Sequence, residues 1–173
     1  MDSTSYPCAS DFVLFTDGSG HQDGYGGWAA LVKSTTRPDL HNIRMGGMTQ
    51  TSVDRMEMTA MVEGLHMTLA LAGRVAPQGG RLNGKHSVIW FSDRESLIKS
   101  ALGEYGRGNS TDLWNQYAWF ETQLTIIPIH VRREVDHEEF RSVDLHASTI
   151  RIILKNYDNS IRNIEPSSLS QTH

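Results

Sequence analysis

Two apolar runs in this sequence end in the same way, with an aspartate two residues after the last bulky side chain. The runs are Phe12–Phe15, followed by Asp17, and Val88–Phe91, followed by Asp93. Between them, residues 53–72 carry apolar side chains at helical spacing. If the two runs are parallel, adjacent strands joined by this helical crossover, both aspartates emerge at one sheet edge. Taken alone, Asp17 also fits an Asx turn at the end of a strand.

The remaining apolar patterns alternate between strand and helix. Pro128 has no amide hydrogen to donate to a ladder, which places the last strand at a sheet edge. Thr51 or Ser52 would cap the long helix. The order implies a mixed sheet flanked by helices, an α/β fold. We predict strands at 11–17, 28–32, 41–49, 88–91 and 126–131, and helices at 53–72, 95–103, 111–124 and 138–156.

The length of 173 residues suits one domain with a real core. We predict this domain at 11–156. Residues 1–10 read as a loose leader, and residues 157–173 as a polar tail without clear periodicity, which we also expect to be loose.

Composition excludes several classes of protein. No stretch approaches the ~18 apolar residues of a membrane span, and the start of the chain lacks the pattern of a signal peptide. The single cysteine, Cys8, fits a reducing compartment. We therefore expect a cytoplasmic protein, and a monomer. The net charge of −4 argues against a strong, nonspecific nucleic-acid binder, although a local patch with metal ions could still meet nucleic acid.

Two further acids fall where the helices would bring them to the same edge. Glu57 lies near the start of the long helix, beside its apolar stripe, and that start should be close to Asp17. Asp144 borders the inward face of the last helix. Clustered carboxylates repel one another unless a cation neutralises them, and hard oxygen ligands suit Mg²⁺ or Mn²⁺. Two such ions, about 3.5–4 Å apart, are a common device for cutting phosphodiesters. The alternative is four unrelated acids among the 20 of the chain.

Five motifs resemble, in order and context, those of the type 1 ribonucleases H, which cut the RNA strand of RNA·DNA hybrids. They are FTDGS at 15–19, GGWAALV at 26–32, DRMEM at 54–58, FSD at 91–93 and VDLHAS at 143–148. The resemblance covers about residues 11–155. It implies the ribonuclease H fold, a five-stranded mixed sheet in the order 3-2-1-4-5. It also implies that four carboxylates are catalytic and bind two Mg²⁺ ions, or Mn²⁺: Asp17, Glu57, Asp93 and Asp144.

The same resemblance implies a substrate-binding set of Gly18, Ser19, Gly20, Asp54 and Arg55. Gly18 would let the chain turn and bring backbone amides near a phosphate or ribose. Ser19 would bond the substrate backbone or orient Asp17. Hybrid recognition would depend on the 2′-hydroxyls of the RNA strand and on groove shape.

The chain departs from the family in the loop before the last helix. Glu134 stands where family members commonly carry a histidine. His137, three residues later, could take that role or be an ordinary exposed histidine. We therefore expect slower turnover and a preference for Mn²⁺.

Other departures from the family concern substrate binding. Val53-Asp54 replaces an asparagine pair, and Asp54 could instead help to cap the helix. Phe140-Arg141 replaces an Asn-Glu pair, and the basic handle expected between Leu102 and Ser110 is missing. We expect weak binding unless a protein partner or accessory factor supplies affinity. The basic loop 74–87 would lie opposite the carboxyl edge, as a solubilising or partner-binding insertion.

Three hypotheses follow from these observations. The first is a metal-dependent endoribonuclease acting on RNA·DNA hybrids. The second is a nuclease of the same fold that cuts DNA or double-stranded RNA, which the altered Val53 and Asp54 would permit. The third is a catalytically weak nucleic-acid-binding or scaffold relative. The intact set of four acids argues against the third, because a repulsive cluster with no metal to bind would be expected to drift.

Overall fold

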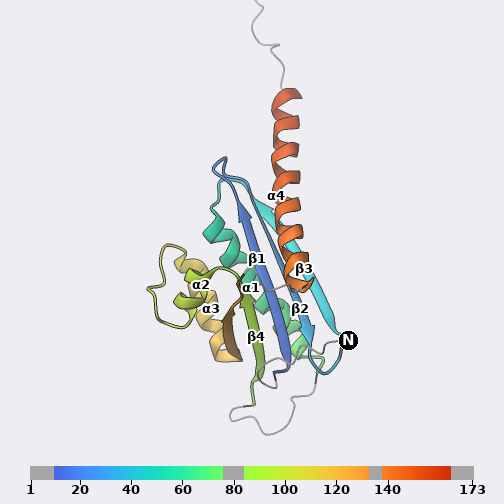
Figure 1. Cartoon of the computed structure of the whole chain (residues 1–173), viewed down its shortest axis with the longest axis vertical. Coiled ribbons are helices and arrows are strands. Elements are labelled where there is room, and N and C mark those ends of the chain that lie inside the picture. Colours follow the sequence, from blue (N-terminus) through green and yellow to red (C-terminus); the bar gives the residue numbers. More distant parts are fainter. Residues whose placement is uncertain (1–9, 76–83, 133–137, 165–173) are drawn as a thin grey trace, which may run out of the picture.

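A five-stranded mixed sheet runs through the protein, with the strand order β3-β2-β1-β4-β5 (Figure 1). The computed structural model describes residues 10–75, 84–132 and 138–164. β1 pairs antiparallel with β2, and β2 with β3, whereas β1 with β4 and β4 with β5 are parallel. The predicted sheet order is confirmed, and β5 lies at an edge. The strands are β1 (Phe12–Gly20), β2 (Gly26–Ser34), β3 (His41–Met48), β4 (His86–Ser92) and β5 (Leu124–His130).

Helices cover both faces of this sheet. Alternate residues of β1 point to opposite sides, so Leu14 joins the core shared with α1, α2 and α3, whereas Phe15 joins the core beneath α4. Trp90 and Phe91 of β4 divide in the same way between the two cores. The helices are α1 (Val53–Ala72), α2 (Glu95–Ala101), α3 (Thr111–Gln123) and α4 (Glu138–Ile164).

α1 begins and ends at the predicted residues, and its start is fixed by a side-chain cap. The backbone N–H of Arg55 donates to Ser52 Oγ at 3.2 Å, so Ser52 is the N-cap and Asp54 lies in the first turn. The cap determines where α1 starts relative to the sheet. That start is the part of the helix that carries Glu57.

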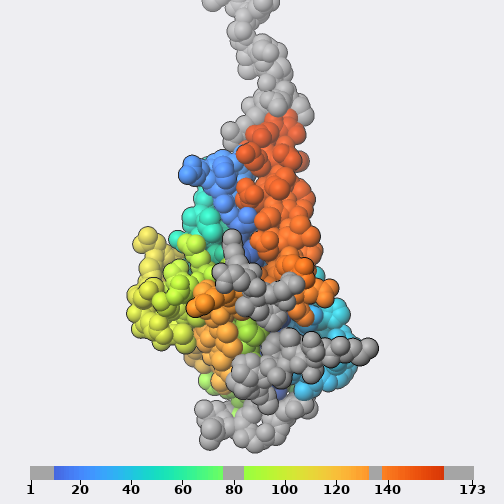
Figure 2. Space-filling view, in the orientation of Figure 1, coloured from blue at the N-terminus to red at the C-terminus, as the bar shows by residue number. Residues whose placement is uncertain are grey.

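Several elements are longer than the sequence suggested, among them β2, which was predicted at 28–32 and spans Gly26–Ser34. β1 continues past Asp17 to Gly20, because its antiparallel ladder with β2 extends to the pair Gly20–Gly26. α4 continues past residue 156 to Ile164 and extends beyond the end of the sheet (Figures 1 and 2). None of the helices within the described ranges is long and apolar enough to cross a membrane.

Candidate active site

Three carboxylates from separate segments meet at one end of the sheet. Ligand oxygens of Asp17, Glu57 and Asp93 all lie within 4.8 Å of one another. The register explains the two aspartates: Phe15 of β1 pairs with Phe91 of β4, and each aspartate follows two residues later. Their side chains therefore leave the sheet at the same level and on the same face. The predicted convergence of these three acids is confirmed.

A glycine in β1 allows α1 to bring Glu57 to this position. A Cβ atom at Gly18 would lie 2.7 Å from Glu57 Cα and still closer to the Glu57 backbone nitrogen, which is a direct overlap. At Gly20, a Cβ would lie 2.8 Å from the backbone nitrogen of Val53. Strand and helix backbones thus touch where a larger residue would force them apart. The motif glycines position Glu57. The turn predicted at Gly18 is wrong, because β1 stays extended through Gly20.

The three acids are held in a poorly solvated environment. Asp17 and Glu57 are only 2% and 3% exposed, and Asp93 is half-buried. Burial raises the pKa of Glu57 well above its ordinary value, and the negative charges of Asp17 and Asp93 raise it further. A backbone hydrogen bond from Gly18 and the charge of Arg94 oppose this rise in pKa only in part.

One oxygen of this group has an unfilled bonding capacity. Glu57 Oε2 is buried and accepts no hydrogen bond from the residues that the structure describes. A buried acceptor without a partner is costly to the fold. A divalent cation would satisfy that oxygen and neutralise the group. The all-carboxylate donor set fits Mg²⁺ or Mn²⁺ rather than a softer metal.

Asp144 does not join the three. It is exposed on α4, and the carboxylate group found among the described residues does not contain it. Its neighbour Val143 and Ala147, one turn on, are fully buried against the sheet. Asp144 therefore borders the inward face of α4, as expected, with its side chain in solvent.

Ser19 links β1 to α4 beside the carboxylates. Arg151 Nε donates to Ser19 Oγ at 3.0 Å, and Ser148 Oγ lies 3.5 Å from the same oxygen. Asp144, Ser148 and Arg151 have the spacing of one helix face. Neither Ser148 nor Arg151 was among the predicted site residues. Their helical spacing from Asp144 is the signal that could have identified them.

The predicted substrate residues of α1 are both engaged in ion pairs. Asp54 pairs with Arg94, the N-cap of α2. Arg55 pairs with Asp112 of α3, with Arg55 Nη2 and Asp112 Oδ2 2.7 Å apart. Asp54 is thus an ion-pair partner, and the capping role is filled by Ser52. Arg94 was missed by the sequence reasoning, although it directly follows Asp93.

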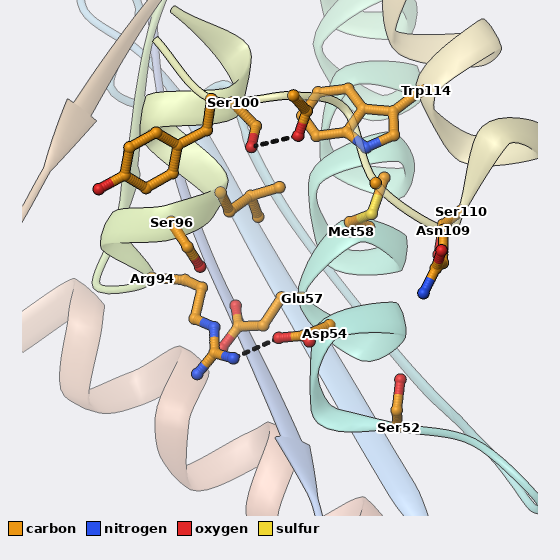
Figure 3. Close-up of a pocket in the computed structure, with 14 residues that line it drawn as sticks. Ser52, Asp54, Glu57, Met58, Arg94, Ser96, Ser100, Asn109, Ser110 and Trp114 are labelled. Carbon is orange, nitrogen blue, oxygen red and sulfur yellow. Dashed lines mark hydrogen bonds and ion pairs between the residues drawn. The ribbon is translucent and has the colours of Figure 1, made fainter.

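A pocket of about 410 Å³ opens beside Glu57, between the N-terminal ends of α1, α2 and α3 (Figure 3). Asp54 and Arg94 form one side of it. Asn109 and Ser110 line it at the start of α3. The pocket places polar donors and the partly positive end of a longer helix, α3, next to the carboxylates.

Some predicted features lie outside the described residues. Glu134 and His137 are among them, as are residues 1–9, the middle of the insertion at 76–83, and residues 165–173. The predicted roles of these residues stay predictions.

Comparison with known proteins places this fold. The RNase H family model matches residues 9–76, and no curated protein matches the sequence. The N-terminal RNase H domain of Rv2228c from Mycobacterium tuberculosis superimposes with a TM-score of 0.70 at 14% identity, covering 87% of this chain and 99% of that domain.

Two further solved structures have the same arrangement. LC11-RNase H1, isolated from compost by a metagenomic approach and solved in complex with an RNA/DNA hybrid, has a TM-score of 0.67 at 13% identity, covering 83% of this chain and 99% of that one. RNase H1 from the archaeon Halobacterium salinarum has a TM-score of 0.58 at 16% identity, covering 84% and 98%. The resemblance drawn from the motifs is confirmed: the chain has the fold of the type 1 ribonucleases H, and its residues 9–76 match the RNase H family.

Proposed function

We propose that this protein is a metal-dependent endoribonuclease that hydrolyses the RNA strand of RNA·DNA hybrids. The observation that carries the proposal is the buried group of Asp17, Glu57 and Asp93, with ligand oxygens within 4.8 Å of one another. It lies at one end of the inner strands β1 and β4, in a sheet whose fold is that of the ribonucleases H. A relative with this fold has been solved with an RNA/DNA hybrid bound.

The carboxylates define where metal would be held. Asp17, Glu57 and Asp93 would bind Mg²⁺ or Mn²⁺, and Asp144 would act from α4 as a fourth acid of a two-ion site. Bound ions of this kind supply an activated water and stabilise the leaving oxygen of a phosphodiester. The unsatisfied Glu57 Oε2 supports this assignment independently of any relative.

The surrounding residues would hold the substrate strand across these acids. Gly18 brings its backbone amide to the site, where it already bonds Glu57. Ser19 is held by Arg151, so a cation lies beside the carboxylates on the α4 side. The pocket with Arg94 and Ser110 offers donors on the α1 side. Duplexes that contain RNA are recognised largely by groove shape and 2′-hydroxyls, so donors on both sides of the acids would suit a hybrid.

A cleavage assay tests the proposal. End-labelled RNA·DNA hybrid, double-stranded RNA, duplex DNA and single strands are incubated with the protein in Mg²⁺ or Mn²⁺, alongside an Asp17→Asn variant. We expect cleavage of the RNA strand of the hybrid alone, and none by the variant.

The other outcomes separate the rival hypotheses. Cleavage of double-stranded RNA or DNA in preference to the hybrid would favour a nuclease of different specificity. Equal residual activity in the protein and in Asp17→Asn would mean that these carboxylates catalyse nothing, which leaves a binding or scaffold protein. The expected monomer, the cytoplasmic location and the accessory partner stay predictions.

A further inference from the structure

Building on the proposed function, we propose that Arg94 grips a backbone phosphate of the bound strand and that Asp54 competes with this phosphate for the guanidinium. In the free protein Asp54 holds Arg94 in an ion pair. In the complex the phosphate takes its place. The Asp54–Arg94 pair is then a charge latch that sets how tightly, and at what salt concentration, the strand is held.

The position of Arg94 suits this role. It directly follows Asp93, one of the three clustered acids, and its side chain reaches from the start of α2 to the first turn of α1 (Figure 3). Arg94 and Asp54 line the same pocket as Glu57. A phosphate held by Arg94 would therefore lie on the strand that crosses the carboxylates, close to the reacting bond.

Arg94 also has an unused donor. Its Nε is buried and makes no hydrogen bond to the described residues, although the guanidinium pairs with Asp54. A phosphate has enough acceptor oxygens to engage two adjacent guanidinium N–H groups at once. The structure shows a single contact, between Arg94 Nη2 and Asp54 Oδ1. Release of Asp54 would free the guanidinium to turn and present Nε to the phosphate.

The charges of the pocket explain why a competitor matters. Among the described residues that line the pocket, Arg94 is the only cation, whereas two acids, Asp54 and Glu57, also line it. A phosphate cannot enter favourably while Asp54 occupies Arg94, because the acid both repels the phosphate and blocks its partner. Metal bound to the three clustered acids would neutralise the repulsion between Glu57 and the phosphate, but it would leave the repulsion by Asp54.

Exchange of partners is easy because the ion pair lies at the surface. The side chains of Arg94 and Asp54 are 43% and 70% exposed, so Asp54 regains full hydration when it is released. Exposed ion pairs contribute little to stability, whereas arginine–phosphate contacts are strong. Ser110, the N-cap of α3, also lines the pocket and makes no side-chain capping bond. It therefore retains a hydroxyl to offer the same phosphate.

A double-mutant cycle on hybrid binding tests the latch. Binding of a fluorescent RNA·DNA hybrid is measured by anisotropy over a range of salt concentrations, with Ca²⁺ as the divalent ion and gels to check that the hybrid stays intact. The variants are Arg94→Gln, Asp54→Asn and the two combined. Arg94→Lys is added as the conservative change. Thermal melts establish that every variant is folded.

We expect Arg94→Gln to weaken binding about tenfold and to lower the slope of log K against log salt by about 0.7–0.9, the loss of one phosphate contact. Arg94→Lys should keep the slope and recover part of the affinity. Asp54→Asn should tighten binding about threefold, because the phosphate no longer has to displace an exposed ion pair of this strength. In the Arg94→Gln background the same change should have almost no effect, because the guanidinium for which Asp54 and the phosphate compete is gone.

The Arg37–Asp39 pair supplies the matched control. It is an exposed ion pair, with Arg37 Nη2 2.7 Å from Asp39 Oδ2, in the turn between β2 and β3 and outside the pocket. Neutralising Arg37 by Arg37→Gln should leave the salt slope unchanged. A similar loss of slope there would mean that any lost positive charge weakens binding.

Two results would overturn the latch and leave the proposed function standing. Arg94→Gln could bind as the unchanged protein does, or Asp54→Asn could tighten binding equally in both backgrounds, which is independent repulsion. If the unchanged protein cleaves the hybrid and either result appears, only the latch fails. If the unchanged protein neither binds nor cleaves the hybrid, the proposed function fails, and the latch fails with it.

Discussion

The acids of the candidate site form two groups that the fold positions in different ways. Asp17, Glu57 and Asp93 are fixed by paired strands and by a helix that touches the strand backbone at Gly18. Asp144 depends on the rotational position of α4 alone, and it lies in solvent. Backbone pairing brings side chains together within a few ångströms, whereas a helix position beside a packed face only brings a side chain near.

This difference has an electrostatic consequence. The three clustered acids share a buried site in which the pKa of Glu57 is raised by burial and by its two neighbours. Asp144 is exposed on α4 and lies outside this cluster. We therefore expect the clustered acids to dominate metal binding and Asp144 to tune it.

The largest expected effect is on catalysis. Asp17→Asn or Asp93→Asn should reduce hybrid cleavage by on the order of 10³-fold or more, because each removes a metal ligand worth several kcal/mol in the transition state. Asp144→Asn should reduce hybrid cleavage by only about tenfold, because it removes a single charge that is exposed to solvent. Single-turnover cleavage rates measure both. Equal losses at Asp17 and Asp144 would show that α4 moves to join the cluster.

Metal binding should separate the two groups without any substrate. Saturating Mg²⁺ or Mn²⁺, at about 100 times the dissociation constant, should stabilise the protein by about 2.7 kcal/mol. For a domain of this size that corresponds to a rise in melting temperature of roughly 5–10 °C. Asp17→Asn should abolish the rise, and Asp144→Asn should keep most of it. A full loss in Asp144→Asn would contradict the comparison.

The same contrast explains what the sequence could predict. Asp17 and Asp93 follow their apolar runs at equal distances, so the strand register alone brings them together. Glu57 follows from the capped start of α1. The exposure of Asp144 could not be predicted, because a small rotation of α4 moves its side chain between the site and solvent. The pairing of Asp54 with Arg94 depends on how α1 and α2 pack, which no local pattern encodes.

Element lengths show a related limit. The long helix α1 was predicted to the residue because a cap and an apolar stripe mark it. β1 was predicted too short, since Gly18 and Gly20 are poor strand residues and only the ladder with β2 keeps them extended. α4 was also predicted too short, because its last turns extend beyond the sheet and lack a continuous buried stripe (Figure 1).

Removing the buried charge should make the metal-free protein more stable. The pKa of Glu57 is higher in the folded state than in the unfolded state. At pH values between these two pKa values, folding takes up a proton, so the free energy of unfolding falls as pH rises. The stabilisation is therefore complete below the unfolded pKa, and it is lost as pH rises through the higher folded pKa. Glu57→Gln should flatten this dependence.

At neutral pH, Glu57→Gln should stabilise the metal-free protein by about 2 kcal/mol, or roughly 4–8 °C. Melting temperatures in EDTA from acid to neutral pH provide the measurement. The matched control is Glu63→Gln, which changes an exposed acid of the same helix paired with Arg44. An unchanged pH profile in Glu57→Gln would mean that Glu57 does not carry the buried charge.

The smallest expected effect concerns the bond that joins the two groups. Arg151 Nε donates to Ser19 Oγ at 3.0 Å, so it ties α4, which carries Asp144, to the strand that carries Asp17. Arg151→Gln should lower stability by about 1 kcal/mol, one hydrogen bond, which is roughly 2–4 °C. The metal-induced rise in melting temperature should be unchanged, because none of the three clustered acids depends on α4. If that rise shrinks as well, α4 and the cluster form one cooperative unit, and Asp144 belongs with the other acids despite its exposure.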